Sequence, residues 1–358
     1  MSSPSIPPVS SASPDQPASV NLTAPRARRF VIRLLSLLAW LVALSAVLWA
    51  FLALVISFPI SVLRWPVALG LAAIALIAAI RLARRPFGPA FALLTCAAPV
   101  FFWWLTLTPH NDRRWQPDME KTPWAEIAGD LVTIHNFRHA DRRSATDFTP
   151  RWESRIFHLS ALQHLDFYMV YWGSPHICHT MMTFDFGPEG RVCASIEARR
   201  EHDESYSPLA GAFRQYELLY VLGDERDIVR LRAPLNAATD QVYLFRIAAT
   251  PEVTRALFLD YLASANRLRT QPAWYHSFTT NCSTLIREHV NNAHAFEPWD
   301  WRLLANGHLD QRLYAQGYLD QSLPLPELKA RSLINPSALA AGDSPDFSTR
   351  IRAGRPGF

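Results

Sequence analysis

Three long apolar runs near the N-terminus constrain the fold most. They cover residues 34–58, 65–80 and 87–108. The first contains no charged residue and is long enough to cross a hydrocarbon core of about 30 Å. The second is short, but it can be extended because Arg81 can reach the membrane surface with its head group. The third ends in a cluster of aromatic residues typical of a membrane interface. Residues 30–108 are therefore expected to form three transmembrane helices.

Arginine residues predict how these helices are oriented. The arginines beside the first run and after the second are Arg26, Arg28, Arg29, Arg33, Arg81, Arg84 and Arg85, and only Arg64 lies between the first two runs. The positive-inside rule then places the N-terminus in the cytoplasm and everything after the third run outside. The first run is too long for a cleaved signal peptide, so it is expected to remain as an anchor. Residues 1–29, rich in Ser and Pro, are expected to form a disordered cytoplasmic tail.

The overall charge does not indicate a nucleic-acid-binding protein. The chain of 358 residues has a formal net charge of +4, and only 18% of its residues are charged. The arginines that set the topology account for much of this excess. The remaining chain shows no basic helix with interleaved aromatic residues, so we expect no nucleic-acid partner.

Residues 109–293 show the pattern of an α+β domain outside the membrane. Segments rich in β-branched and aromatic residues predict strands at 131–137, 152–158, 165–172, 180–186, 192–197, 218–222, 228–231 and 242–247. Residues 187–190 (GPEG) predict the turn of a hairpin. Thr250 and Pro251 predict the start of a helix over 251–268. Residues 111–126 are interpreted as a polar connector with Trp115 and Trp124 at the lipid head groups, and residues 294–358 as a C-terminal extension without a strong pattern.

Cys282 is the best candidate for a nucleophile. It stands where the polar segment YHSFTTN turns into an amphipathic helix. The positive end of a helix dipole and the unpaired N–H groups of a first turn favour a thiolate over a thiol. Asn281, Ser283 and Tyr275 are candidates for holding a developing oxyanion or positioning the substrate. The alternative is a buried cysteine that acts only as a small apolar residue.

His179 is the candidate base because it opens the predicted hairpin strand. An imidazole that reaches the thiol would form a thiolate–imidazolium pair with it. Glu197, with Ser195, lies on the second hairpin strand and could orient the ring. Arg199 and Arg200 are candidates for binding substrate. The alternatives are a structural histidine and a solvated run of charges.

The other cysteines permit a disulfide or a metal site, and neither is favoured. In the predicted hairpin Cys193 lies opposite a residue near Phe184, not opposite Cys178. His176, Cys178 and His179 could bind zinc together with Cys193 or Cys282. Neighbouring strand residues point to opposite faces, however, so Cys178 and His179 could not easily share one ion. We expect no metal and no cofactor.

Several stretches together resemble one bacterial family, the Lnb N-terminal periplasmic domain. They are NDRRWQPD, VTIHNFRH, DFTPRWESR, CHTMMTFDF, SIEARRE, FRQYELLYVLGDERDIVRLR and YHSFTTNCST. The resemblance implies a circularly permuted papain-like fold in which the histidine strand precedes the cysteine helix. It assigns Cys282 as nucleophile and His179 as base, whereas the role of Glu197 is inferred from the hairpin. Members named for Lnb are similar to lipoprotein N-acyltransferases.

These observations predict an inner-membrane protein whose periplasmic domain is a thiol-dependent acyltransferase or hydrolase. Its expected partners are membrane lipids or lipoproteins, and its expected intermediate is an acyl-thioester. One alternative is an amidase or peptidase of the NlpC type acting on peptidoglycan. Others are a membrane-anchored binding module without catalysis and a zinc hydrolase.

Overall fold

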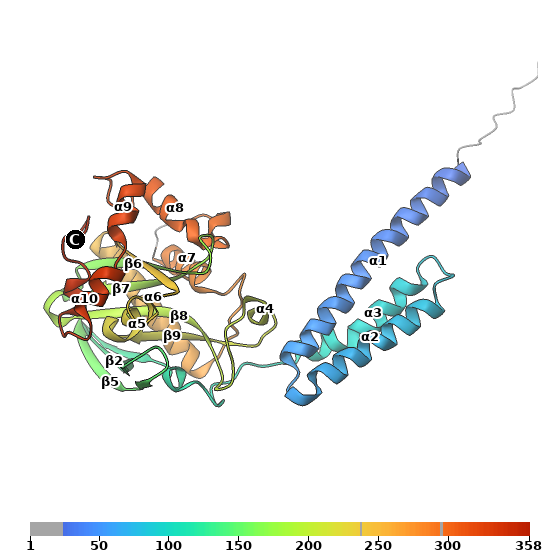
Figure 1. Ribbon diagram of the computed structural model, residues 1–358, viewed down its shortest axis with the longest axis horizontal. Helices are drawn as coiled ribbons and strands as arrows, with labels where there is room; N and C mark the ends of the chain where they lie inside the picture. The colour runs from blue at the N-terminus through green and yellow to red at the C-terminus, as the bar shows by residue number, and fades with distance from the viewer. Residues whose placement is uncertain (1–23, 237, 294–295) are drawn as a thin grey trace, which may run out of the picture. The chain divides into compact units, whose positions relative to one another are not determined.

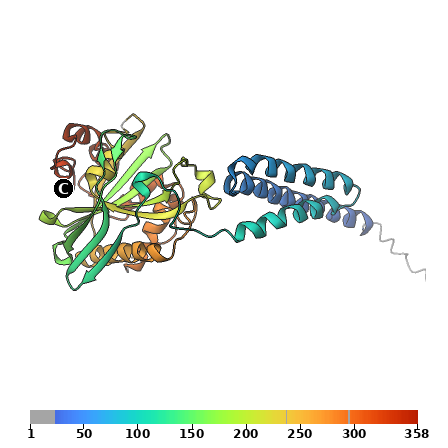
Figure 2. The same ribbon diagram turned by 90° about the horizontal axis from the view of Figure 1, so that it is seen from below.

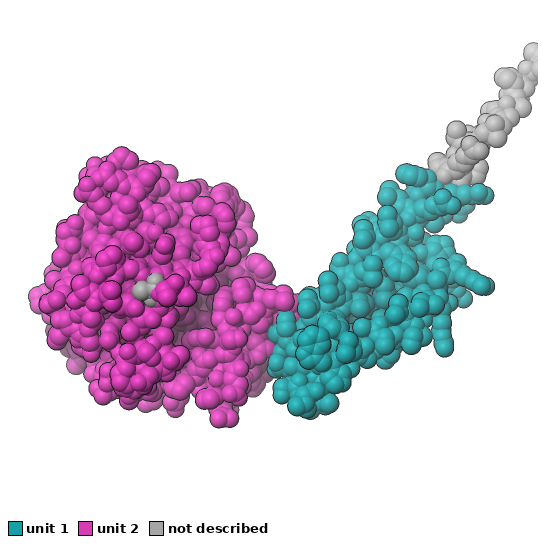
Figure 3. Space-filling model, in the orientation of Figure 1, with its two compact units in different colours: residues 1–105 teal, residues 106–358 magenta. Residues whose placement is uncertain are grey.

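The structure, a computed structural model, describes residues 24–236, 238–293 and 296–358. It divides into two compact units, Met1–Leu105 and Thr106–Phe358 (Figure 3). Most of the tail predicted to be disordered, residues 1–23, lies outside the described residues. The cytoplasmic placement of this tail stays a prediction.

The first unit consists of three apolar helices, α1 (Ala24–Ser57), α2 (Arg64–Arg81) and α3 (Gly88–Leu105) (Figure 1). All three are long and apolar enough to cross a membrane, which confirms the three predicted spans. Their mutual contacts include the small residues Ala43, Ala75, Ala79 and Ala90. Small residues let helix backbones approach closely. Close packing of this kind drives helix association in a membrane, because lipid provides no hydrophobic driving force between helices. The third helix ends at Leu105, three residues before the predicted limit.

The second unit is built around an eight-stranded sheet in the order β1-β2-β9-β8-β7-β6-β10, with β5 paired to β2. The strands are β1 (Trp124–Ala128), β2 (Leu131–Arg138), β5 (Trp152–His158), β6 (His164–Trp172), β7 (Cys178–Asp185), β8 (Arg191–Arg199), β9 (Glu217–Gly223) and β10 (Asp240–Ile247). Two further short strands, β3 (Asp141–Arg142) and β4 (Phe148–Thr149), form a separate pair. The expected α+β class is therefore confirmed.

The central hairpin of β7 and β8 has the predicted turn and register. A 3₁₀ turn at Gly187–Glu189 joins the two strands. Gly187 and Gly190 have φ values of 59° and 103°, which glycine adopts without strain. Cys193 pairs with Thr183, next to Phe184 and far from Cys178 in the register. All four cysteines are free.

Helices cover both faces of the sheet (Figure 2). The strand residues alternate between the two sides, as their pleat requires. Met182 of β7 packs with α6 (Pro251–Thr270) and α7 (Cys282–Asn292), whereas Met181 packs with α5 (Glu225–Arg232) and α10 (Asn335–Ala341). Thr250 caps α6 by accepting a hydrogen bond from the Val253 N–H, as predicted. The order of β7 before α7 is also the predicted order of histidine strand and cysteine helix.

Two local predictions are wrong. Residues 228–231 were expected to form a strand but lie in α5, which begins where the Asp224 carboxylate caps the Arg226 N–H. The adjacent Ile228 and Val229 favoured a strand, but they fill one face of this helix instead.

In the expected connector, Trp124 belongs to β1 and stacks on His135, and Trp115 is buried. Neither tryptophan is free to rest at head groups.

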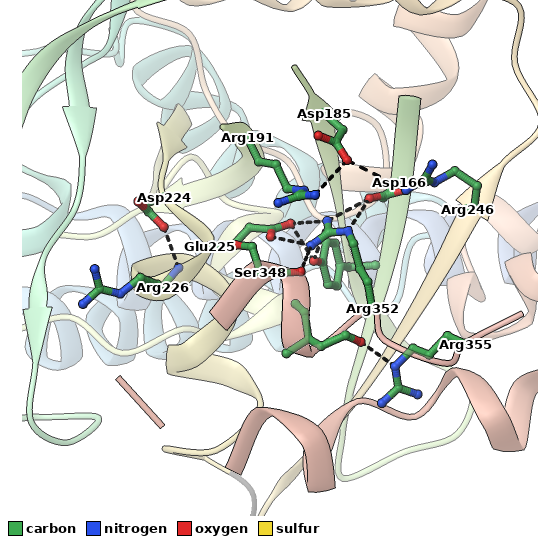
Figure 4. Close-up of polar contacts among 12 residues, drawn as sticks. Asp166, Asp185, Arg191, Asp224, Glu225, Arg226, Arg246, Ser348, Arg352 and Arg355 are labelled. Atoms are coloured by element: carbon green, nitrogen blue, oxygen red, sulfur yellow. Dashed lines mark hydrogen bonds and ion pairs between the residues drawn. The ribbon is translucent and has the colours of Figure 1, made fainter. Parts of the chain in front are cut away.

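The segment described as a C-terminal extension packs as part of the second unit. It includes short 3₁₀ turns at Trp301–Leu303 and Asn306–His308, and the helices α8 (Leu309–Ala315), α9 (Leu325–Ser332), α10 and α11 (Phe347–Arg350). Arg352 fixes its end. The guanidinium donates two hydrogen bonds of 2.7 Å to Glu225 and two of 2.8 and 2.9 Å to Asp166 (Figure 4). Arg246 also pairs with Asp166.

Candidate active site

Cys282 is the first residue of α7, and its position is fixed by the residue before it. The Asn281 side chain accepts hydrogen bonds from the N–H groups of Ser283 and Thr284, and the Thr284 hydroxyl accepts one from the Asn281 N–H. This reciprocal capping box starts the helix at one defined residue. The Asn281 amide also donates to the Ser277 carbonyl, which ties the cap to the preceding loop. The thiol is therefore buried at the N-terminal end of a well-defined helix.

The imidazole of His179, on β7, forms a hydrogen bond with this thiol. Burial raises the pKa of Cys282, but the hydrogen bond and positive charge of His179 lower it by more, to about 7. Burial lowers the pKa of His179, and the Glu197 charge together with the thiol raises it to about 9. Between these values the thiolate and the imidazolium are both the favoured forms. The structure thus brings the predicted nucleophile and base together, in surroundings that favour the charged form of each.

Glu197 lies behind the histidine ring, as the hairpin predicted. Its Oε1 is 3.2 Å from His179 Nε2, and Ser195 Oγ bridges the two, 2.7 Å from the ring nitrogen and 2.6 Å from the carboxylate. Burial raises the pKa of Glu197, but His179 and Arg232 hold it well below its ordinary value. Arg232 Nη2 lies 3.3 Å from the same oxygen. The carboxylate is therefore ionised and can keep the ring oriented and positively charged.

The candidates for oxyanion binding have different surroundings. The Asn281 side chain and the N–H of Ser283 are already used in the helix cap. Neither is free to bind a substrate oxygen while the cap is formed. The Cys282 N–H, at the first helical position, has no acceptor within the helix itself. The cap does not use this N–H, which leaves it as a candidate donor to a substrate oxygen.

Tyr275 is close enough to the thiol for the charge of Cys282 to act on it, and so is Tyr206, which was not predicted from the sequence. The hydroxyl groups of Tyr275 and Tyr206 are 3.3 Å apart. Burial raises the pKa of both phenols, and the nearby Cys282 thiolate raises them further. Tyr206 is the more exposed of the two. The pair can therefore offer hydroxyl groups to a substrate near the nucleophile.

Arg199, predicted to bind substrate, is instead a buried structural residue. Its guanidinium donates to the carbonyls of Met119 and Glu120 and to the Asn111 side chain, and it stacks on Trp115 at 4.1 Å. These contacts fix the segment that enters the domain. Arg200 is partly exposed, so its predicted role in substrate binding stays a prediction.

Asn306 is a site residue that the sequence did not reveal. Its amide nitrogen donates to the Cys178 carbonyl at 2.6 Å and to Ser283 Oγ at 2.7 Å, and it lies 3.9 Å from Cys282 Sγ. Its carbonyl oxygen accepts from the Cys178 N–H. One side chain thus ties the start of β7 to the start of α7. No local motif distinguishes it, because it lies in the segment without a strong pattern.

No metal-binding group was found among the described residues. In that part of the chain, no cluster of three or more His, Cys, Asp or Glu side chains is arranged to hold an ion. Cys178 is buried, and burial, followed by the charge of Cys282, raises its pKa well above the ordinary range. Asn306 is a hydrogen-bond partner of the N–H, the carbonyl and the thiol of Cys178.

Comparison with known proteins shows a match to a protein family over part of the chain. Residues 148–307 match the sequence profile of the family described as the Lnb N-terminal periplasmic domain. This segment contains His179, Glu197, Cys282 and Asn306. No curated protein and no solved structure matches the chain significantly.

Proposed function

Residues 148–307 belong to the family of Lnb N-terminal periplasmic domains, and from this membership we propose that the protein is a thiol-dependent acyltransferase. The family and the three apolar helices make it a membrane protein with a periplasmic domain. The main support for the proposal is the buried arrangement of Cys282, His179 and Glu197. In it the thiol has a pKa of about 7 and the imidazole a pKa of about 9. Strongly shifted pKa values in an ordered polar cluster are typical of catalytic groups.

In the first half-reaction, the Cys282 thiolate attacks the carbonyl carbon of an acyl ester in a membrane lipid. The carbon–oxygen bond breaks, and the His179 imidazolium gives its proton to the departing alcohol. The products are the free alcohol, an acyl-thioester on Cys282 and a neutral imidazole. The Cys282 N–H can stabilise the oxyanion that forms in between.

In the second half-reaction, an amine attacks the thioester carbon. The carbon–sulfur bond breaks, the thiolate is restored, and His179 takes the proton that the amine nitrogen loses. The amide is released and the ion pair is ready for another cycle. Glu197 keeps the imidazole charged and oriented in the first step and favours its protonation in the second. Water in place of the amine would make the same site a hydrolase.

The membrane anchor supports a lipid-linked substrate. An enzyme tethered at the bilayer meets acyl lipids at a high effective concentration without needing strong binding. An amine at the end of a lipoprotein would be held at the same surface. This proposal therefore assigns membrane lipids as acyl donors and lipoproteins as acceptors.

The test is to incubate the full-length protein in detergent with a phospholipid that carries a labelled acyl chain, and to map the label by mass spectrometry of peptides. We expect a thioester on Cys282, with Cys96, Cys178 and Cys193 as internal controls in the same chain, and loss of the label when an amine acceptor is added. An unmodified Cys282, with lipoproteins acylated equally in cells with and without the protein, would contradict the proposal.

The alternatives give different results in cells. Altered muropeptides in a deletion strain, with no thioester on Cys282, would indicate a peptidoglycan amidase or peptidase. A Cys282→Ala variant that fully complements the deletion would indicate a binding module without catalysis.

A further inference from the structure

An apolar cavity lies beside the nucleophile. It has a volume of about 250 Å³ and lies between the sheet, α6, α7 and the C-terminal segment. Its apolar lining includes Leu165, Met182, Val253, Ile286, Val290 and Leu313. The catalytic steps described above use none of these side chains.

The cavity reaches the thiol through two hydroxyl residues. Thr180 and Ser283 both line it, and their oxygens are 3.5 Å apart. Ser283 Oγ lies 3.9 Å from Cys282 Sγ, and Thr180 is a hydrogen-bond partner of the thiol. A group bonded to Cys282 Sγ is therefore adjacent to one end of the cavity.

From this end the cavity follows one face of α7. Ser283, Ile286, Arg287 and Val290 line it at the spacing of successive helical turns. The rise per residue of an α-helix gives a length of about 10 Å from Ser283 to Val290. The space is thus elongated and leads away from the reacting atoms.

The wall opposite α7 comes from the C-terminal segment. Leu303, Leu309 and Leu313 face the same space, as does an ion pair between Glu297 and Arg312. Because these two charges satisfy each other, they offer little to a polar ligand. Arg287 is a further cation in the lining.

We propose that this cavity holds the hydrocarbon chain of the acyl group carried by Cys282. The inference rests on the proposed acyltransfer and adds that a chain of several methylene groups, not a peptide, occupies the space along α7. An elongated apolar pocket removes the chain from water, and each methylene it buries strengthens binding about fourfold. The polar stem of a peptidoglycan peptide would lose its hydrogen bonds to water there.

The first experiment measures acylation of Cys282 in the full-length protein by activated esters of acetate, octanoate and dodecanoate. Wild type is expected to react faster as the chain lengthens. Val253→Trp and Val290→Trp fill the cavity from α6 and from α7. Each should lower the rate of acylation by the dodecanoyl ester by about tenfold or more, because a few methylene groups no longer fit in the pocket. The rate with the acetyl ester should stay within about twofold of wild type.

Matched controls sit on the same two helices. Glu252→Trp and Glu288→Trp add the same ring at exposed positions. They should leave the rate of acylation by each ester unchanged. Equal slowing of acetyl and dodecanoyl esters by the pocket variants, or no dependence on chain length in wild type, would overturn the inference. The proposed acyltransfer would still stand in that case, because Cys282 would still form a thioester.

A second experiment separates the cavity from the chemistry. The Cys282→Ala variant is incubated with a photoactivatable fatty acid, and the cross-linked peptides are identified. Cross-links to residues 247–257 and 283–290 that disappear in Val290→Trp would support the chain site even if no ester acylates Cys282. Cross-links confined to the three membrane helices would overturn it.

Discussion

At the scale of single residues, burial and charge act on the Cys282 thiol in opposite directions. Burial favours the neutral thiol, and the hydrogen bond and charge of His179 favour the thiolate by more. His179 is itself kept charged against its burial by Glu197, with which Ser195 shares a short hydrogen bond. We therefore expect the reactivity of Cys282 to depend on the Glu197 carboxylate, which acts through His179.

The Glu197→Gln variant tests this dependence. Without the carboxylate charge the pKa of His179 should fall from about 9, and the pKa of Cys282 should rise from about 7 because the imidazole is less often charged. The rate of thioester formation in wild type should rise with pH through about 7 and fall through about 9. The variant should show a narrower profile and a maximum lower by at least about tenfold. This is less than the hundredfold or more that a positioned acid–base group contributes, because the imidazole itself remains.

The control for this profile is Glu252→Gln, which neutralises an exposed carboxylate on α6. It should keep the wild-type profile. A Glu197→Gln profile with the same limits and the same maximum would show that Glu197 does not act through His179.

At the scale of secondary structure elements, helix α7 presents the nucleophile and strand β7 presents the base. Asn306 joins the starts of both. The capping box of Asn281 and Thr284 decides at which residue the helix begins, and so where the thiol lies. Asn281 has a structural role in this arrangement, because its side-chain atoms are committed to the cap.

Asn281→Ala should therefore lower stability as well as reactivity. Loss of a helix cap costs about 1 kcal/mol in the free energy of unfolding. Asn281→Ser keeps a cap oxygen and should restore most of this loss. Chemical denaturation of the full-length protein measures the first effect, and the alkylation rate of Cys282 measures the second. An Ala variant as stable as wild type would show that the cap does not fix the helix start.

The parts predicted correctly from sequence are those with local signals. The β7–β8 hairpin has a Gly/Pro turn and apolar strands on both sides, and α6 has Thr250 and Pro251 at its start. A strand was predicted where α5 lies because the adjacent Ile228 and Val229 favour a strand locally, and the contacts that hold the helix are not local. Glu225 and Asp227 are buried, and their partners are distant arginines. Asn306 was missed because its contact with Cys178 joins residues 128 positions apart.

At the scale of the whole molecule, the C-terminal segment completes the periplasmic unit and walls the cavity. Arg352 anchors its end to Asp166 and Glu225. Burial raises the pKa of Glu225, but Arg352 lowers it by more, to about 2. Because this folded-state pKa lies below the ordinary 4.5, the stabilisation is fully present above pH 4.5 and is lost as the pH falls through about 2.

Arg352→Met should destabilise the periplasmic unit strongly. It leaves the buried Glu225 carboxylate without its cation and leaves Asp166 paired with Arg246 alone. Breaking a buried ion pair in this way costs about 3–5 kcal/mol in the free energy of unfolding. Arg350→Met, two residues away, removes an exposed ion pair and should change stability by about 0.5 kcal/mol or less. Denaturation near neutral pH gives both values. Equal effects of the two substitutions would contradict the anchoring role of Arg352.

The orientation of the three spans is a further prediction at this scale. Arginines gather in the N-terminal part of α1 and at and after the end of α2, which predicts that the N-terminus and the second loop are in the cytoplasm. Alkaline phosphatase, active only in the periplasm, should be active when fused after residue 60 or 108 and inactive when fused after residue 86. The reverse pattern would show the opposite orientation.

We propose that Cys282 and His179 form a reactive ion pair, and the dependence of the Cys282 alkylation rate on pH is the most direct measurement of this pairing. The full-length protein and its His179→Ala variant are compared, with the label mapped to Cys282. In wild type the Cys282 thiol should titrate near pH 7. In the variant its titration should shift to a pH of about 9 or above, because burial then acts against the thiolate without an opposing charge from His179. A thiol that titrates at the same pH in both proteins would contradict the account.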